Sequence, residues 1–331
     1  MARLVIVSNR VALPSRDGRV QTGGLAVAVR AVLKDRPGLW FGWSGSVASE
    51  RDKIETRTIE QGRLSYVITD LTNEDYQEYY NGFANRVLWP ILHYRLDLAE
   101  FSRRDLSGYL RVNEHFAAEL AKVLKPDDVV WVHDYHLLPL ANALRARGFT
   151  NRIGFFLHVP MPPPEILTAL PNHEHVIQLL CHYDLVGFQT ANDAVNFARY
   201  LAIERRLPQL GRFSFRYEDR VVHIGCFPIG IDTKAFHELA ERSVNTRAVQ
   251  QVVKSLSERA LIIGVDRLDY TKGIAQRMDA FERFLKAHAE WRDQVTYLQI
   301  TPKSRSDIQE YGDMDREVST RVGSINGAFG E

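Results

Sequence analysis

The stretch Val129-Val130-Trp131-Val132-His133-Asp134-Tyr135-His136-Leu137-Leu138-Pro139 decides the fold, because a wholly apolar run passes directly into ionisable residues and then into a helical pattern. A run that is apolar on both faces is typical of a buried parallel strand. Similar short runs recur along the chain, with amphipathic helical segments between them. They are Leu4–Val7, Leu39–Gly42, Ile153–Leu157, Leu185–Phe188, Val221–Phe227, Leu261–Val265 and Val295–Ile300. This alternation predicts an α/β fold with doubly wound, parallel sheets.

A domain boundary is expected in Pro228-Ile229-Gly230-Ile231-Asp232, where proline and glycine follow a predicted strand. The sequence therefore predicts an N-terminal domain over residues 1–232 and a second domain over 233–331. A long polar helix is expected from about Thr233 to Arg259. Only about two strand–helix units follow it, and an open sheet of two parallel strands is too small for a complete domain. We expect the second domain to be incomplete.

Composition limits the classes of function. Lys and Arg total 42 and Asp and Glu total 41, so the net charge of +1 favours neither nucleic acid nor an anionic membrane as a partner. The two cysteines show no metal-binding spacing and are typical of reduced residues in a cytosolic protein. No apolar stretch approaches the roughly 20 residues that span a bilayer. The sequence predicts a cytoplasmic protein, and it leaves open whether the chain forms a homo-oligomer.

Two predicted strands each deliver a polar residue to their carboxyl ends, where open α/β sheets bind ligands. Asp134 follows one strand and could accept hydrogen bonds from sugar hydroxyls or act as a base. His158 follows the next, before a proline-rich loop. A metal site at His133 and His136 is the alternative, but it lacks a third ligand and a helical context. Tyr80 and Trp89 lie among polar residues and glycine, so each could equally contact a ligand or pack in the core.

Basic residues also follow predicted strands. Arg10 ends the first strand, and Gly23-Gly24 then open a helix whose amino end could receive a phosphate or diphosphate. An ordinary turn is the alternative, and the dinucleotide pattern GxGxxG is absent. Arg267 and Lys272 precede another helix and could hold a diphosphate, unless Asp266 and Asp269 pair with them.

Arg305, after the last predicted strand, could reach a phosphate on an acceptor.

Taken together, these segments resemble the trehalose-6-phosphate synthases, retaining glycosyltransferases of the GT-B type with two Rossmann-like domains that face a cleft. The resemblance covers the whole chain and is carried by long motifs. They include VSNR, TGGLAVAV, LWFGWSG, EYYNGFANRVLWP, HYRLDL, WVHDYHLLPLA, NRIGFFLHVPMPPPEI, DLVGFQTAND, FPIGID and VDRLDYTKGI. It implies transfer of glucose from UDP-glucose to glucose 6-phosphate, with retention, to give α,α-trehalose 6-phosphate and UDP. It implies no metal, cofactor or protein nucleophile, since the leaving phosphate takes the acceptor's proton.

The resemblance also implies roles for individual residues. The positions that match the acceptor site are Arg10, Tyr80, Trp89, Asp134 and Arg305. The positions that match the donor site are Gly23, Gly24, His158, Arg267 and Lys272. Asp134, His158, Arg267 and Lys272 are the residues expected to carry catalysis.

One departure affects the expected activity. Family members continue beyond Gly330 with a segment similar to RDGMNLVAKE that contacts the donor, and nothing in this sequence matches it. We therefore expect a C-terminally truncated synthase that is weak or inactive as a 331-residue chain. Two alternatives stay open: a non-catalytic, sugar-phosphate-binding partner of a full-length synthase, and a pseudo-glycosyltransferase that joins cyclitols through nitrogen.

Overall fold

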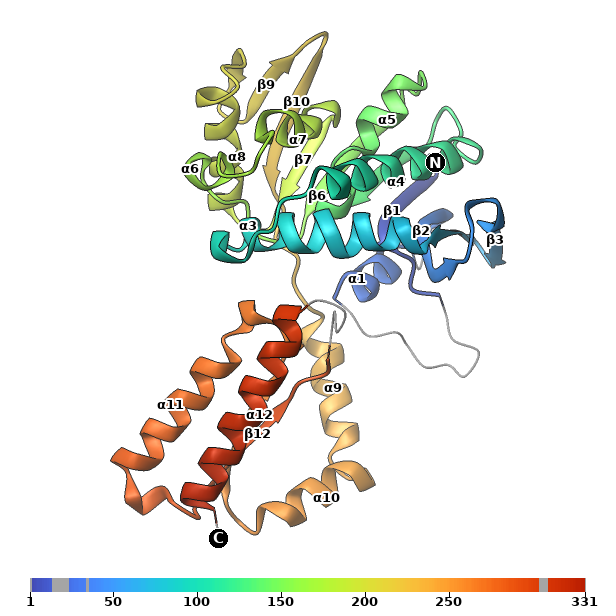
Figure 1. Cartoon of the computed structure of the whole chain (residues 1–331). Helices are drawn as coiled ribbons and strands as arrows, with labels where there is room; N and C mark the ends of the chain where they lie inside the picture. The colour runs from blue at the N-terminus through green and yellow to red at the C-terminus, as the bar shows by residue number, and fades with distance from the viewer. Residues whose placement is uncertain (1, 14–23, 34–35, 304–308, 331) are drawn as a thin grey trace. The chain divides into compact units, whose positions relative to one another are not determined.

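The computed structural model describes residues 2–13, 24–33, 36–303 and 309–330 (Figure 1). The chain forms two compact units, residues 1–229 and residues 230–331. The sequence placed a boundary between two Rossmann-like domains after Asp232, and that assignment stays a prediction.

Unit 1 is built on one ten-stranded sheet with the order β3-β4-β2-β1-β5-β6-β7-β10-β9-β8. In this order, all neighbouring strands from β4 through β10 pair in parallel. At one end of the sheet β3 is antiparallel to β4, and at the other end β9 is antiparallel to both β10 and β8. The predicted α/β class and parallel sheet are confirmed. The strands are β1 Leu4–Arg10, β2 Gly38–Ala48, β3 Thr56–Gln61, β4 Leu64–Thr72, β5 Val129–His133, β6 Arg152–Leu157, β7 Leu185–Phe188, β8 Gln209–Gly211, β9 Ser214–Tyr217 and β10 Arg220–Cys226.

Helices connect these strands and cover the sheet (Figure 1). Trp40 and Phe41 of β2 are fully buried in the core. The longer helices of unit 1 are α1 Gly24–Leu33, η2 Tyr76–Leu88, α4 Arg103–Ala121, α5 Leu140–Ala146 and α8 Ala191–Ile203. The shorter ones are η1 Arg51–Lys53, α2 Asn73–Asp75, α3 Trp89–Leu92, η3 Leu96–Leu98, η4 Tyr135–Leu137, α6 Pro164–Leu167, α7 His173–Gln178 and η5 Leu179–His182.

Unit 2 contains one parallel pair of strands, β11 Ala260–Val265 and β12 Val295–Ile300. Its core lies under helices α11 Ile274–Ala287 and α12 Gln309–Phe329, where Met278, Leu285 and Met314 are buried together. Short turns η6 Tyr270–Lys272 and η7 Ala289–Trp291 flank α11. The two predicted strand–helix units are therefore present, and the sheet has two strands.

The predicted single helix from Thr233 to Arg259 is wrong. The segment forms two helices, α9 Thr233–Ser243 and α10 Arg247–Leu256. Thr246 takes an extended conformation at the start of α10, and its hydroxyl donates to the carbonyl of Ser243 at 2.8 Å. Local hydrogen bonds from threonine compete with the helical ladder, and the apolar pattern of the segment did not reveal this break.

The two cysteines differ in burial and therefore in the reactivity of their thiols. Cys181 is fully buried, and burial raises the pKa of its thiol to about 12, whereas Cys226 is exposed at the end of β10. Only the thiolate reacts quickly with disulfide reagents. We therefore expect Ellman's reagent to label one thiol per folded chain and two after denaturation. Rapid reaction of both thiols in the folded protein would contradict the burial of Cys181.

None of the helices in the described ranges combines the length and the hydropathy that crossing a membrane requires.

Candidate functional site

The site of unit 1 lies at the carboxyl edge of its central parallel strands. β1 pairs with β2 on one side and with β5 on the other, and β6 follows β5. The strand order reverses at β1, which is the kind of position where open α/β sheets bind ligands. Arg10 ends β1, Asp134 follows β5 and His158 follows β6, so the parallel register brings these three predicted residues to one edge.

Asp134 adopts a strained backbone conformation, with φ 77° and ψ 164°. Its N–H donates to the carbonyl of Phe156 at 2.8 Å, and its Oδ1 accepts the backbone N–H of His158 at 3.3 Å. Non-glycine residues rarely take positive φ, and such strain concentrates at functional sites. Two bonds to the β6 segment thus hold the Asp134 carboxylate beside His158.

His158 forms a pair with a second histidine. Its Nε2 lies 3.0 Å from Nδ1 of His133, which is buried at the end of β5. Burial lowers the pKa of His133 to about 3, with a smaller contribution from His158. Burial also lowers the pKa of His158, although the Asp134 carboxylate opposes this. Both rings are therefore neutral near pH 7, and one nitrogen must donate to the other.

The alternative metal site at His133 and His136 is not assembled in unit 1. His133 bonds to His158, whereas the ring of His136 stacks on Tyr80 with centroids 5.7 Å apart. Within the described ranges, no cluster of three or more His, Cys, Asp or Glu residues has the geometry to hold a metal ion.

An aromatic row connects Arg10 to the Asp134 segment. The Arg10 guanidinium carbon lies 5.7 Å from the centroid of the Trp43 ring, and Trp43 packs against Tyr80 at 6.0 Å. Tyr80 then stacks on His136, two residues after Asp134. Arg10 and Tyr80 are thus linked by ring contacts, and Tyr80 is half-buried so that part of its side chain faces solvent. A flat aromatic face beside a cation suits a phosphorylated sugar.

Trp89 lies deeper than Tyr80. Its side chain is 5% exposed, and its ring packs 4.0 Å from His93 and 5.7 Å from Tyr135. Trp89 therefore supports the Asp134 segment from within the core, and its predicted contact with the acceptor stays a prediction.

Tyr80 is carried by η2, an unusual helix whose thirteen residues have π-type winding. Such winding is rare and is frequent at functional sites. A glycine lets η2 approach α4 closely, because a Cβ on Gly108 of α4 would lie 2.3 Å from that of Glu78. A side chain at position 108 would therefore push η2 away from α4.

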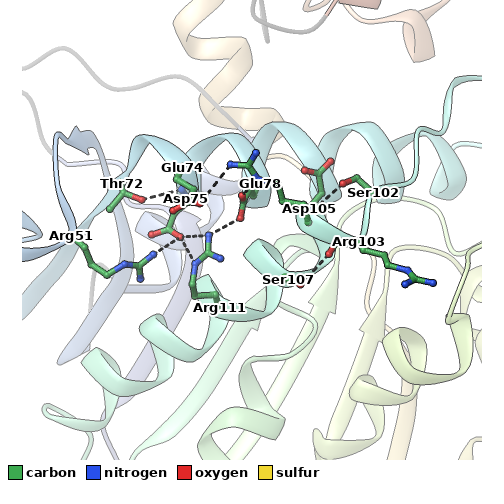
Figure 2. A network of polar contacts seen from close by, with 11 residues as sticks. Arg51, Thr72, Glu74, Asp75, Glu78, Ser102, Arg103, Asp105, Ser107 and Arg111 are labelled. Atoms are coloured by element: carbon green, nitrogen blue, oxygen red, sulfur yellow. Dashed lines mark hydrogen bonds and ion pairs between the residues drawn. The ribbon is translucent and has the colours of Figure 1, made fainter.

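An ion network fixes the start of η2 against α4 (Figure 2). Arg111 of α4 donates to Asp75 and to Glu78, each at 2.7 Å, and both carboxylates are buried. Arg51 adds an ion pair to Asp75 at 3.2 Å, and Arg104 donates to Glu78. Burial alone would raise the pKa of Glu78, but the hydrogen bonds from Arg111 and Arg104 outweigh it and lower that pKa. The network holds the start of η2, just before Tyr80.

Unit 2 carries the predicted cationic pair. Arg267 and Lys272 are exposed around η6, just before α11. Asp266 pairs with Arg277 at 2.7 Å, and the buried Asp269 caps η6 through Thr271. Arg267 lies 4.0 Å from Asp269, and among the described residues no carboxylate lies within ion-pair distance of Lys272. Asp266 and Asp269 were the residues that could neutralise Arg267 and Lys272. Of the two, only Asp269 makes such a contact, and it is the long one to Arg267.

Of the three remaining predicted site residues, Gly23, Gly24 and Arg305, the structure describes only Gly24. Gly24 begins α1 and has no atom within 4 Å of where a Cβ would lie. Gly23 and Arg305 lie outside the described residues. Trp43 and Gly45 were not among the predicted site residues, although both belong to the segment LWFGWSG, and His136 was considered only as a metal ligand. A glycine directly after a run rich in aromatic residues is the signal that could have drawn attention to Gly45.

Known proteins resemble this chain over its whole length. The family model described as glycosyltransferase family 20 matches residues 3–331. A trehalose-6-phosphate synthase of Sinorhizobium fredii is 51% identical over 331 residues, which cover all of this chain and 71% of the relative.

Two solved structures are also similar. An alpha,alpha-trehalose-phosphate synthase (UDP-forming) from Burkholderia xenovorans, in complex with glucose-6-phosphate, matches with a TM-score of 0.95 and 43% identity, over 100% of this chain and 72% of that one. An Escherichia coli structure described as trehalose-6-phosphate bound with UDP-2-fluoro glucose gives a TM-score of 0.91 and 41% identity, over 100% and 71%.

Proposed function

This chain belongs to glycosyltransferase family 20, and from that membership we propose that its site binds glucose 6-phosphate as the acceptor of a glucosyl group from UDP-glucose. The product is α,α-trehalose 6-phosphate, with UDP as the leaving group, as in the UDP-forming synthase that binds glucose-6-phosphate. The close match to that structure confirms the predicted GT-B fold class. A cytoplasmic location and homo-oligomerisation stay predictions.

One observation carries the proposal: the parallel register brings the cation Arg10 and the carboxylate Asp134 to one sheet edge, and the Tyr80 ring of η2 is linked to both segments by its contacts with Trp43 and His136. Arg10 binds the acceptor phosphate through charge-assisted hydrogen bonds. Asp134 accepts hydrogen bonds from the hydroxyl groups of the acceptor sugar. Tyr80 offers its ring to the sugar's apolar face. Trp89, whose ring packs against Tyr135, is kept as a predicted contact to the acceptor. Arg305 is kept as a predicted second phosphate ligand.

The donor is assigned to the remaining residues. His158 contacts the donor sugar, and Gly23 and Gly24 let the start of α1 approach the diphosphate. Arg267 and Lys272 neutralise the negative charge that grows on the departing diphosphate. In the transfer, the acceptor hydroxyl oxygen bonds to the donor's anomeric carbon while the bond to the UDP oxygen breaks. The departing phosphate oxygen takes the hydroxyl proton, and configuration is retained.

Replacing Arg10 with Ala tests the acceptor site. A charge-assisted hydrogen bond contributes about 1.5–3 kcal/mol. We therefore expect Arg10→Ala to weaken glucose 6-phosphate binding by roughly 10- to 100-fold. Calorimetric titration measures this affinity. Saturation-transfer NMR measures the binding of the weak ligand glucose, which should be the same in Arg10→Ala and in the unsubstituted protein.

Arg152→Ala is the matched control, because Arg152 is an exposed arginine at the amino end of β6, the opposite edge of the sheet. Equal affinities of the unsubstituted protein for glucose and glucose 6-phosphate would contradict the proposal. An unchanged affinity in Arg10→Ala would contradict it as well.

A further inference from the structure

The Arg10 side chain rests on a bulge in the neighbouring strand. The register between β2 and β4 shifts between Trp43 and Val47, and Gly45 lies within this bulge with φ +92°. The bulge is fixed by local hydrogen bonds: Trp43 Nε1 donates to the carbonyl of Ser46 at 2.7 Å, and Ser46 N–H donates to Ser44 Oγ at 2.9 Å. Bulges are frequent beside active sites, where they redirect side chains.

Gly45 leaves the space that the Arg10 guanidinium occupies. A Cβ on Gly45 would lie 2.5 Å from Nη2 of Arg10 and 2.7 Å from both Cζ and Nε. Carbon atoms do not approach other heavy atoms so closely, so one group must move. Arg10 is exposed and its guanidinium ends a flexible side chain, whereas the bulge is held by hydrogen bonds. The guanidinium would therefore move and the fold would stay.

We propose that Gly45 is a positioning residue, which seats the Arg10 guanidinium against Trp43 for the phosphate of the acceptor. Two neighbours restrict Arg10, because the centroid of the Trp43 ring lies 5.7 Å from its Cζ and the place of a Cβ on Gly45 lies within 2.7 Å of its planar group. A binding group whose freedom is already restricted loses less entropy when the ligand arrives. The phosphate role of Arg10 in this inference rests on the proposed function.

The substitution Gly45→Ala tests the inference. We expect it to weaken glucose 6-phosphate binding by about tenfold or more, because a displaced guanidinium loses a charge-assisted bond. Binding of glucose should not change. The double variant Arg10→Ala/Gly45→Ala should bind glucose 6-phosphate no more weakly than Arg10→Ala alone, since Gly45 acts only through the Arg10 side chain.

Gly148→Ala is the matched control for backbone strain. Gly148 has a similar φ of +82°, and nothing lies within 4 Å of where its Cβ would be. Both alanine variants carry the strain of a positive φ and should lower Tm to a similar extent. Only Gly45→Ala should weaken phosphate-dependent binding. Equal binding of glucose 6-phosphate by Gly45→Ala and Gly148→Ala would overturn the inference.

The outcomes separate the inference from the proposed function. If Arg10→Ala weakens glucose 6-phosphate binding and Gly45→Ala does not, the positioning role is wrong and the proposed function stands. If Arg10→Ala has no effect, both are wrong. Should Gly45→Ala fail to fold, side-chain NMR of the unsubstituted protein decides. The Arg10 Nε–H group should then be more restricted than that of Arg152, and equal mobility would overturn the inference.

Discussion

Replacing Asp134 with Asn is expected to weaken glucose 6-phosphate binding by about 100-fold or more, because a carboxylate that accepts bonds from two sugar hydroxyls contributes roughly 1.5–3 kcal/mol for each. The substitution keeps the shape of the side chain and removes its charge. Asn also tolerates positive φ better than most residues. Its Oδ1 can still accept the N–H of His158, so the loop after β5 should keep its structure.

Calorimetric titration with glucose 6-phosphate measures the loss, and thermal unfolding shows whether the fold is kept. Asp127→Asn is a suitable control, since Asp127 is exposed just before β5 and lies away from the carboxyl edge of the sheet. An Asp134→Asn variant that binds glucose 6-phosphate as tightly as Asp127→Asn would exclude the proposed hydroxyl contacts.

Replacing Arg111 with Met is expected to lower the free energy of unfolding by about 3 kcal/mol, the lower end of the range for breaking a buried ion pair. Arg111 is the residue that bridges Asp75 and Glu78, and its loss leaves two buried carboxylates with weaker partners. Met retains the packing of the aliphatic stem. Because the side chain of Arg111 is 33% exposed, water can reach the site and moderates the loss.

Urea denaturation gives this difference, with Arg103→Met as control. Arg103 lies on the same helix, and Figure 2 shows its side chain directed away from the network. Arg103→Met should therefore unfold like the unsubstituted protein. A loss of stability in Arg103→Met equal to that in Arg111→Met would show that the network does not hold η2.

The effect of Arg111→Met should depend on pH. Arg111 and Arg104 lower the pKa of Glu78 in the folded chain, in spite of burial. A lowered carboxyl pKa stabilises the fold above the pKa of the unfolded chain, and this stabilisation is lost as pH falls through the folded value. The free energies of unfolding of the unsubstituted protein and Arg111→Met should therefore differ more at about pH 7 than at about pH 3. A difference in unfolding free energy that stays constant over this range would contradict the role of Glu78.

Much of the sheet could be predicted because its strands are covered on both faces. Val129–Val132 and Leu185–Phe188 are continuous apolar runs, and both form the strands expected of them. β3 was missed because Thr56–Gln61 is exposed along its whole length and carries mostly polar side chains. Its pairing with β4 follows from the surrounding structure and not from local hydrophobicity.

The site was predictable where strand ends determine it. Arg10, Asp134 and His158 are polar residues at or shortly after the ends of apolar runs, and the parallel register places them at one edge. Gly45 could not be assigned a role in the same way, since its effect depends on the bulge and on where the Arg10 side chain lies. The same holds for Glu78 and Arg111, which meet only because η2 packs against α4.

The unequal exposure of the two thiols has a practical consequence. Cys226 lies just before the passage from Ile229 to Gly230, where one compact unit gives way to the other. A maleimide dye could therefore be attached at this junction in the native sequence, without engineered cysteines. Fluorescence anisotropy of that dye would report the local mobility at the end of β10, and whether added sugar phosphate changes it.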